Sequence, residues 1–271
     1  MSNYIQIEFQ NISQEQSDVL IAQLSEIGFE GFEEEENRLK AFIVSTAYNE
    51  KLLQNISAPL QLHFSKTIIE ETNWNQVWES NFDPVIVDDF VAVRADFHEP
   101  VKDVQLEIVI TPKMSFGTGH HATTFMMMQQ MREIDFTNKS VFDFGTGTGV
   151  LAILAKKLGA KNILAIDNDS WSIENAAENI KRNDCTAIDL KFADIAPMNG
   201  KFDIILANIN KNVILENLED LSKQLSVSGC VVLSGLLPED EEDVLIKSQE
   251  TGLKLLQRDK RSNWLLLKLS P

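Results

Sequence analysis

The chain has 271 residues, of which 44% are hydrophobic, so it is long enough to bury a sizeable core. Its 41 acidic side chains outnumber the 24 basic ones and give a formal net charge of −17. This acidity argues against nucleic acid as the main partner, because phosphate binding depends on a basic surface. It is compatible with a basic protein substrate, or with solubility alone.

No stretch of eighteen apolar residues occurs, and the first residues lack the basic-then-apolar pattern of a signal peptide. We therefore expect a cytoplasmic protein without a membrane span. The two cysteines, Cys185 and Cys230, lie in apolar contexts without the spacing of a motif. This context favours buried, reduced thiols.

Residues 1–70 are predicted to form a small α+β domain. The expected elements are strands at 4–9, 29–32, 39–44 and 60–69, and helices at 13–27 and 48–56. Ser13, followed three residues later by Gln16, is typical of a capping box at a helix start. Four apolar residues should share one face of that helix: Val19, Leu20, Leu24 and Ile27. The run 33–37, rich in glutamate, is expected to be a solvated turn. The order βαββαβ is that of a ferredoxin-like unit.

Residues 71–100 are predicted to link this domain to the rest of the chain. Trp74 and Trp78 are four residues apart and would share one face of a linker helix over 71–83. A hairpin should follow, with strands at 82–87 and 90–93 and Asp88-Asp89 at its turn. The third region, 101–271, then opens with a strand over 104–110.

The segment Thr111–Thr124 contains two glycines and two histidines and runs into a helix near Thr123. Such a loop is costly to order unless it contacts something, so we expect it to close over a cofactor. His120 and His121 do not predict a metal site, because adjacent side chains point apart and no cysteine or carboxylate stands nearby at ligand spacing. The methionines that follow are expected to fill the core: Met126, Met127, Met128 and Met131.

From residue 139 onward, apolar strands alternate with amphipathic helices, which predicts a doubly wound parallel sheet of seven strands. The strands are expected at 139–144, 162–167, 187–192, 201–207, 229–234, 253–258 and 263–269. The helices are expected at 149–158, 170–183, 211–226 and 238–250. The last two strands are joined by too few residues for a crossover, so they should form an antiparallel hairpin. This hairpin distinguishes methyltransferases from dehydrogenase domains.

The first of these strands runs into three glycines at alternate positions, Gly145, Gly147 and Gly149, before a helix. A dinucleotide fingerprint would need a further glycine at position 150, where Val150 stands. The observed spacing is similar to the first motif of S-adenosylmethionine (SAM)-dependent methyltransferases. Asp167 follows Gly145 by 22 positions, at the end of the next strand, where a carboxylate can accept both ribose hydroxyls of a nucleotide.

Two further polar residues are expected at the carboxyl edge of the sheet, where ligands bind in open α/β folds. Asn208 follows the strand at 201–207 and carries both an amide donor and a carbonyl acceptor, so it could orient an amine nucleophile. Asn210 is better suited to cap the next helix. Asp194, after the third strand, could accept an adenine amino group.

Four segments together resemble the PrmA family, the methyltransferases of large-subunit ribosomal protein eleven. They are 116–124 (FGTGHHATT), 143–153 (DFGTGTGVLAI), 165–169 (AIDND) and 207–209 (ANI). The resemblance implies a class I, Rossmann-like methyltransferase domain behind a ferredoxin-like domain that recognises the ribosomal protein. It also implies methyl transfer from SAM to lysine ε-amines and the N-terminal α-amine of that protein. The family's SAM contacts fall on Thr124, Gly145, Asp167 and Asn208.

Asn208 is thus the candidate catalytic residue, with a role in orienting the amine and with no metal expected. The ribosomal protein would be bound free or before full assembly, by a monomeric enzyme without membrane or direct nucleic-acid contacts. Three alternatives stay open on the motifs alone. They are a SAM-dependent enzyme acting on RNA or a small molecule, a dinucleotide oxidoreductase, and a binding module without turnover.

Overall fold

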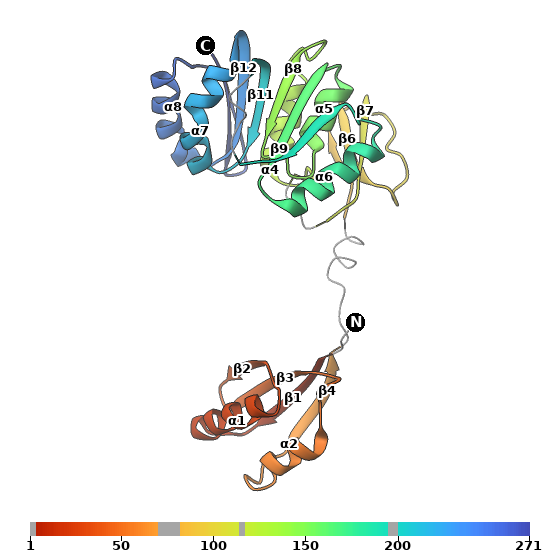
Figure 1. Ribbon diagram of the computed structural model, residues 1–271, viewed down its shortest axis with the longest axis vertical. Coiled ribbons are helices and arrows are strands. Elements are labelled where there is room, and N and C mark those ends of the chain that lie inside the picture. The colour runs from red at the N-terminus through yellow and green to blue at the C-terminus, as the bar shows by residue number, and fades with distance from the viewer. Residues whose placement is uncertain (1–3, 70–81, 114–116, 195–199) are drawn as a thin grey trace. The chain divides into compact units, whose positions relative to one another are not determined.

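The computed structural model describes residues 4–69, 82–113, 117–194 and 200–271 (Figure 1). The chain divides into two compact units, residues 1–78 and 79–271, and each is treated by itself. The linker helix expected over 71–83, with Trp74 and Trp78, lies almost entirely outside the described residues.

The smaller unit has the predicted βαββαβ order. Its elements are β1 (Tyr4–Gln10), α1 (Gln14–Glu26), β2 (Gly31–Glu35), β3 (Arg38–Val44), α2 (Glu50–Ser57) and β4 (Phe64–Ile69). The four strands form one sheet in the order β2-β3-β1-β4, and every neighbouring pair is antiparallel. Alternate residues of β1, namely Ile5, Ile7 and Phe9, are buried in the core of this unit.

The capping box at the start of α1 is confirmed, since the Ser13 hydroxyl accepts from the Gln16 amide and the Gln16 side chain accepts from the Ser13 amide. The predicted apolar face is partly wrong. Leu20 and Leu24 are fully buried, but Val19 is 43% exposed because Ser17 shares the buried stripe in its place. A small polar residue on an inward face carries no hydrophobic signal, so the apolar pattern predicted Val19 on the buried face where the structure has Ser17.

The glutamate-rich turn expected over 33–37 is also wrong. Glu33 and Glu35 belong to β2, where they lie opposite Lys40 and Arg38 of β3. Lys40 forms ion pairs with both glutamates and lowers the pKa of Glu35 through a direct hydrogen bond. Opposite charges on neighbouring strands offset the low strand propensity of glutamate. The turn itself is only Glu36-Asn37, with Asn37 in the left-handed region at φ 59°.

The larger unit begins with a three-stranded sheet of β5 (Val85–Val87), β6 (Val91–Ala95) and β7 (Leu106–Ile110). The predicted hairpin is confirmed, since β5 and β6 are antiparallel and joined through Asp88 and Asp89, whereas β6 and β7 are parallel. The apolar residues of β6 and β7 are buried in the same core as the helices that follow. The hairpin therefore belongs to the larger unit and not to the linker region in which the sequence pattern placed it.

Seven strands form the main sheet of this unit. They are β8 (Ser140–Phe144), β9 (Asn162–Asp167), β10 (Ile188–Phe192), β11 (Phe202–Asn208), β12 (Leu225–Leu236), β13 (Lys254–Arg261) and β14 (Trp264–Ser270). Their order is β10-β9-β8-β11-β12-β14-β13. The strands from β10 to β12 are parallel, and β14 is antiparallel to both of its neighbours. The expected terminal hairpin is confirmed.

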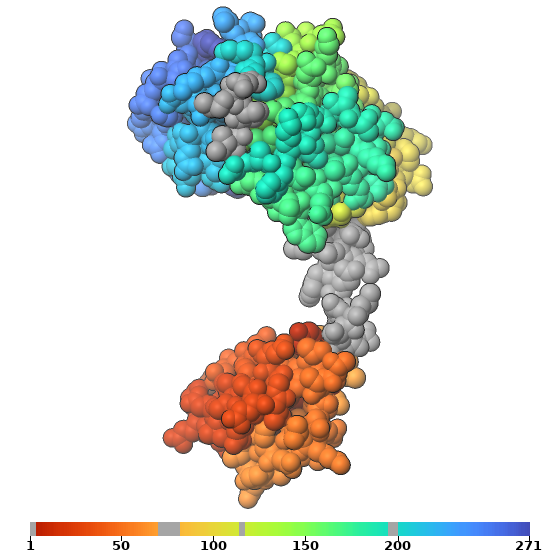
Figure 2. Space-filling view, viewed as in Figure 1, coloured from red at the N-terminus to blue at the C-terminus, as the bar shows by residue number. Residues whose placement is uncertain are grey.

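Helices cover both faces of this sheet (Figure 1). They are α4 (Ala122–Met131), α5 (Val150–Lys157), α6 (Ser170–Arg182), α7 (Lys211–Gln224) and α8 (Glu241–Glu250), the last preceded by a short 3-10 turn at Pro238–Asp240. Val141 packs on the side of α4 and α5, whereas its neighbour Phe142 packs on the side of α7 and α8. The four methionines of α4 are buried, which confirms them as core residues. Figure 2 shows the segments from α6 to α8, coloured green to blue, on much of the viewed face of this unit.

Both cysteines carry free thiols, and burial raises the pKa of each. Cys185 is buried as predicted, whereas Cys230 is only partly buried. Among the residues that the structure describes, no helix is long and apolar enough to cross a membrane.

Candidate functional site

The turn between β8 and α5 brings backbone close to the carboxyl edge of the sheet. Gly145 has φ 77°, and the amides of Gly145 and Thr146 both donate to the carbonyl of Ile166. A Cβ at Gly145 would lie 2.3 Å from Cγ2 of Ile209, on the far side of the crevice between β8 and β11. Only glycine fits this left-handed, closely approached position. We call residues 145–149 the glycine loop.

Asp167 ends β9 and supports the glycine loop directly. Its Oδ2 accepts from the amide of Gly147 at 2.8 Å, and its Oδ1 accepts from the amide of Asp169 at 3.0 Å. Each carboxylate oxygen has a second lone pair. The side chain can therefore hold the loop and still accept two hydroxyls from a ligand in the cavity beside it.

A cavity of about 280 Å³ opens at this edge. It is lined by Phe144, Gly145, Gly147, Asp167, Asn168, Ser172, Ala193, Asp194, Asn208, Ile209, Asn210 and Val213. The residues come from the ends of β8, β9, β10 and β11 and from the segments that follow them. The structure thus brings together four of the residues singled out in the sequence: Gly145, Asp167, Asp194 and Asn208.

Thr124 does not line this cavity but contacts a residue that does. It lies on α4, is 1% exposed, and its hydroxyl accepts from Nδ2 of Asn208 at 3.1 Å. Asn208 itself is 7% exposed, and its Oδ1 has no hydrogen-bond partner among the described residues. A buried amide oxygen without a partner is costly, so a ligand donor at this position would be favoured.

Asn210 caps α7 through a hydrogen bond from the amide of Val213 to its Oδ1, which confirms its predicted role. The two asparagines thus have different roles. The side-chain oxygen of Asn210 accepts from a helix amide, whereas that of Asn208 can accept from a ligand.

A second hollow adjoins the first. It is lined by His121, Asn208, Ile209, Asn210, Gly235 and Trp264. Residues 208–210 line the first cavity as well. The rings of His121 and Trp264 meet edge to face at a centroid distance of 4.6 Å. The sequence analysis did not identify Trp264, which lies at the start of β14, because only the sheet order brings that position near His121. The segment 208–210 therefore forms a wall that the first cavity shares with a second hollow lined by two aromatic rings.

Residues 117–121, which precede α4, and the first turn of α4 contact the glycine loop and the wall between the two hollows. The Thr148 hydroxyl of the glycine loop donates to the carbonyl of Gly117 at 2.8 Å. His121 caps α4, and its Nδ1 lies 2.8 Å from the Thr123 hydroxyl. The described part of this loop supports the site through Thr124 and His121, but it does not line the first cavity. Phe116 lies outside the described residues.

Asp143 lies fully buried beneath the glycine loop and was not singled out in the sequence. Its Oδ2 accepts from the Thr146 hydroxyl at 2.6 Å, and its Oδ1 has no partner among the described residues. Burial raises the pKa of Asp143 to about 7, against the lowering effects of the Thr146 hydroxyl and the Ala152 amide, and the charge of Asp167 adds to the rise. A carboxylate inside an otherwise apolar strand was the signal available for this residue.

The parallel sheet, its antiparallel final hairpin and a cavity at the carboxyl edge define an α/β methyltransferase. Comparison with known proteins names the family. The model of the family "Ribosomal protein L11 methyltransferase (PrmA)" matches residues 3–270, and the chain belongs to this family.

Similar proteins carry the same name. The ribosomal protein L11 methyltransferase of Porphyromonas gingivalis is 42% identical over 262 residues, which cover 94% of this chain and 90% of that protein. The protein so named from Chlorobaculum parvum is 38% identical over 285 residues, covering 99% and 97%. A crystal structure of a ribosomal protein L11 methylase from Lactobacillus delbrueckii subsp. bulgaricus matches with a TM-score of 0.65 and 30% identity, covering 70% of this chain and 98% of that one.

As a member of this family the protein is a SAM-dependent methyltransferase. The residues of the cavity fit that cofactor. Asp167 presents acceptors for hydroxyl groups, and Gly145 leaves room that a side chain would fill.

Proposed function

We propose that this protein transfers methyl groups from SAM to ribosomal protein L11, at lysine ε-amino groups and at the N-terminal α-amino group. The observation that best supports an amine as the methyl acceptor concerns Asn208. The unpartnered amide oxygen of Asn208 belongs to the wall that the two hollows share, so a donor there would stand between cofactor and substrate.

The cofactor would lie in the first cavity. Asp167 would accept hydrogen bonds from the ribose hydroxyls, Asp194 would accept from the adenine amino group, and the glycine loop would leave space for the backbone of the ligand. Thr124 would keep the Asn208 amide in place through its 3.1 Å hydrogen bond. When bound, SAM supplies a methyl group on a sulfonium centre that a nucleophile can attack in line.

The substrate amine would enter through the second hollow. The edges and faces of His121 and Trp264 suit the aliphatic stem of a lysine, which has four methylene groups. The Asn208 oxygen would accept one N–H of the incoming amine and so direct its lone pair toward the first cavity. Positioning of this kind is the main contribution that such a site can make to a displacement with a good leaving group.

The amine must arrive without its proton, although a lysine in water has a pKa of about 10.4. A partly dry hollow beside a cationic cofactor would lower the pKa of the amine through desolvation and like-charge repulsion. No general base is required in this scheme. His121 is committed to capping α4 and is not assigned that role.

We assign recognition of the ribosomal protein to the N-terminal unit, as a ferredoxin-like domain. Residues 4–69 carry ten acidic and four basic side chains, which suits a basic partner. We further propose that the enzyme acts in the cytoplasm as a monomer on free L11, before assembly into the ribosome, without direct nucleic-acid or membrane contacts.

The test is transfer of an isotopically labelled methyl group from SAM to total ribosomal proteins and ribosomal RNA from a strain that lacks this activity. The proposal predicts label in L11, on lysine and α-amino positions identified by mass spectrometry. Label in RNA, or in another protein, would contradict it. Asn217→Ala is a suitable control variant, because the Asn217 amide on α7 donates to the carbonyl of Val213 within the described part of the chain and lines neither hollow.

A further inference from the structure

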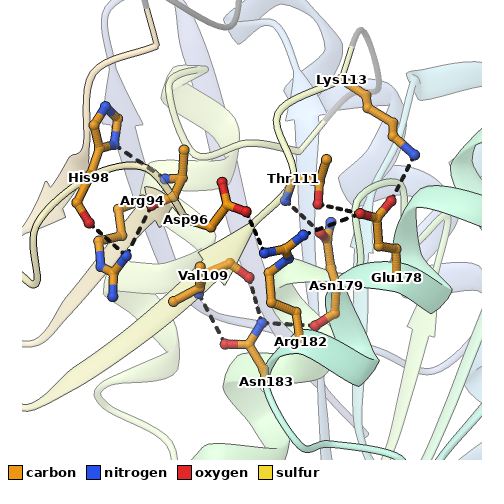
Figure 3. Close-up of polar contacts among 11 residues, drawn as sticks. Arg94, Asp96, His98, Val109, Thr111, Lys113, Glu178, Asn179, Arg182 and Asn183 are labelled. Atoms are coloured by element: carbon orange, nitrogen blue, oxygen red, sulfur yellow. Dashed lines mark hydrogen bonds and ion pairs between the residues drawn. The ribbon is translucent and has the colours of Figure 1, made fainter.

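Two asparagines of α6, Asn175 and Asn179, and its C-cap residue Asn183 lie at four-residue intervals in the sequence. Figure 3 shows Asn179 and Asn183 beside β7 and the residue that follows it. β7 is one of the two edge strands of the three-stranded sheet. Asn183 accepts from the amide of Val109 at 3.0 Å and donates to its carbonyl at 2.6 Å. Two residues on, the amide of Thr111 donates to Asn179 Oδ1 at 2.8 Å, and the Thr111 carbonyl accepts from Asn175 at 3.3 Å. The side chains thus satisfy backbone groups that a neighbouring strand would otherwise pair.

Asn179, unlike Asn183, is also hydrogen-bonded to the glycine loop. Its Nδ2 donates to the carbonyl of Thr148 in the glycine loop at 2.9 Å, and the whole residue is buried. Thr148 in turn donates its hydroxyl to Gly117. A chain of hydrogen bonds therefore runs from Thr111 through Asn179 and Thr148 to Gly117. It connects the glycine loop to Thr111 and to Gly117, which both precede α4.

Glu178 strengthens the outer end of this chain. Its carboxylate accepts from the Thr111 hydroxyl at 2.6 Å and from Lys113 Nζ at 2.8 Å, and it pairs with Arg182 (Figure 3). Arg182 also pairs with Asp96 at 2.6 Å. Thr111 is thus held by both its backbone and its side chain, so the position that Asn179 joins to the glycine loop is itself well anchored.

We propose that Asn179 is a positioning residue for SAM binding, which holds the glycine loop, one wall of the first cavity, against β7 and Gly117 before SAM binds. The inference rests on the proposed placement of SAM in the first cavity. A glycine loop already held in its binding geometry avoids the entropy cost of ordering that loop around the ligand. Asn179 touches no ligand in this scheme, so its effect should appear in SAM affinity more than in the rate of the bound complex.

The test compares Asn179→Ala with Asn183→Ala in the full-length protein, by calorimetric titration of SAM and by thermal unfolding. Both variants lose hydrogen bonds between α6 and β7, but only Asn179→Ala frees the Thr148 carbonyl. We expect Asn179→Ala to raise the Kd for SAM by about tenfold or more, which is the effect of one buried hydrogen bond. Asn183→Ala should stay within about twofold of the wild type by the same reasoning. The kcat at saturating SAM should change little in both.

A second pair of variants covers the case in which Asn179→Ala does not fold. Thr148→Val removes the hydroxyl that reaches Gly117 and should raise the Kd, whereas Thr148→Ser keeps the hydroxyl and should restore it. Equal affinity in Asn179→Ala and Asn183→Ala, or in Thr148→Val and Thr148→Ser, would overturn the inference. Failure of the wild-type chain to bind SAM would instead refute the proposed function.

Discussion

Replacing the buried Asp143 by asparagine should change how the stability of the protein depends on pH. In the folded state burial raises the pKa of this carboxyl to about 7, from an ordinary value of 3.8. A carboxyl whose folded pKa is raised binds its proton more tightly in the folded state. Its contribution is therefore fully present below about pH 4 and is lost as the pH rises through about 7.

The size of the effect follows from the shift. About three pKa units correspond to about 4 kcal/mol, at about 1.4 kcal/mol for each unit. The loss begins at about pH 4, where the unfolded carboxyl ionises, and ends above about pH 7, where the folded carboxyl has ionised too. About 3 kcal/mol of it should therefore fall between about pH 5 and pH 8.5. Asparagine keeps an oxygen that can accept from the Thr146 hydroxyl and does not titrate, so the variant should lack this loss.

The assay is urea unfolding of wild type and Asp143→Asn at both pH values, with the free energy of unfolding taken from linear extrapolation. All other titrating groups are common to the two proteins and cancel in the comparison. The difference in stability between variant and wild type should shift by about 3 kcal/mol in favour of the variant at the higher pH. Parallel pH profiles would show that the folded carboxyl is already ionised at neutral pH and would refute the reasoning.

Two further variants test the supports of the cavity. Glu178→Gln should lower stability at neutral pH by about 1 kcal/mol, a value kept small because Glu178 and Lys113 are both partly exposed. Lys113 and Thr111 lower the pKa of Glu178 to about 2, so the stability it adds is present above its ordinary pKa of 4.5 and lost as the pH falls through about 2. Unfolding experiments at acid pH should therefore show the variant and the wild type converging, and a constant difference would count against the ion pair. Gly145→Ala should abolish measurable SAM binding, because its Cβ would lie 2.3 Å from Ile209 at a φ of 77°, and a variant that binds SAM normally would show that this approach is not needed.

Local patterns predicted the framework of the molecule well. The Ser13 capping box, the alternation of strands and helices after residue 139 and the short final connection each depend on neighbours in sequence, so a single segment contains the whole signal. The position of the glycine loop and Asp167 at the cavity was predictable for the same reason. Asn208 was found because the ends of parallel strands meet at one edge of the sheet.

The features that the sequence analysis missed depend on distant partners. Trp264 enters the site only because β14 lies beside β12, and Asn179 is useful only because Thr111 and Thr148 lie on its two sides. Glu33 and Glu35 extend β2 because Lys40 and Arg38 face them across the sheet. A helix face predicted from apolar residues alone also misses the buried Ser17, and so places the buried side of α1 incorrectly.

The central claim is that Asn208 orients the substrate amine between the two hollows. Its most direct test is Asn208→Ala, measured as the single-turnover rate of methyl transfer to purified L11 at saturating SAM, together with the Kd for SAM. We expect the rate to fall by about a hundredfold, the effect of a misplaced nucleophile, while the Kd changes by only a few-fold. An unimpaired rate of transfer would contradict the claim. So would a loss that lies wholly in the binding of SAM.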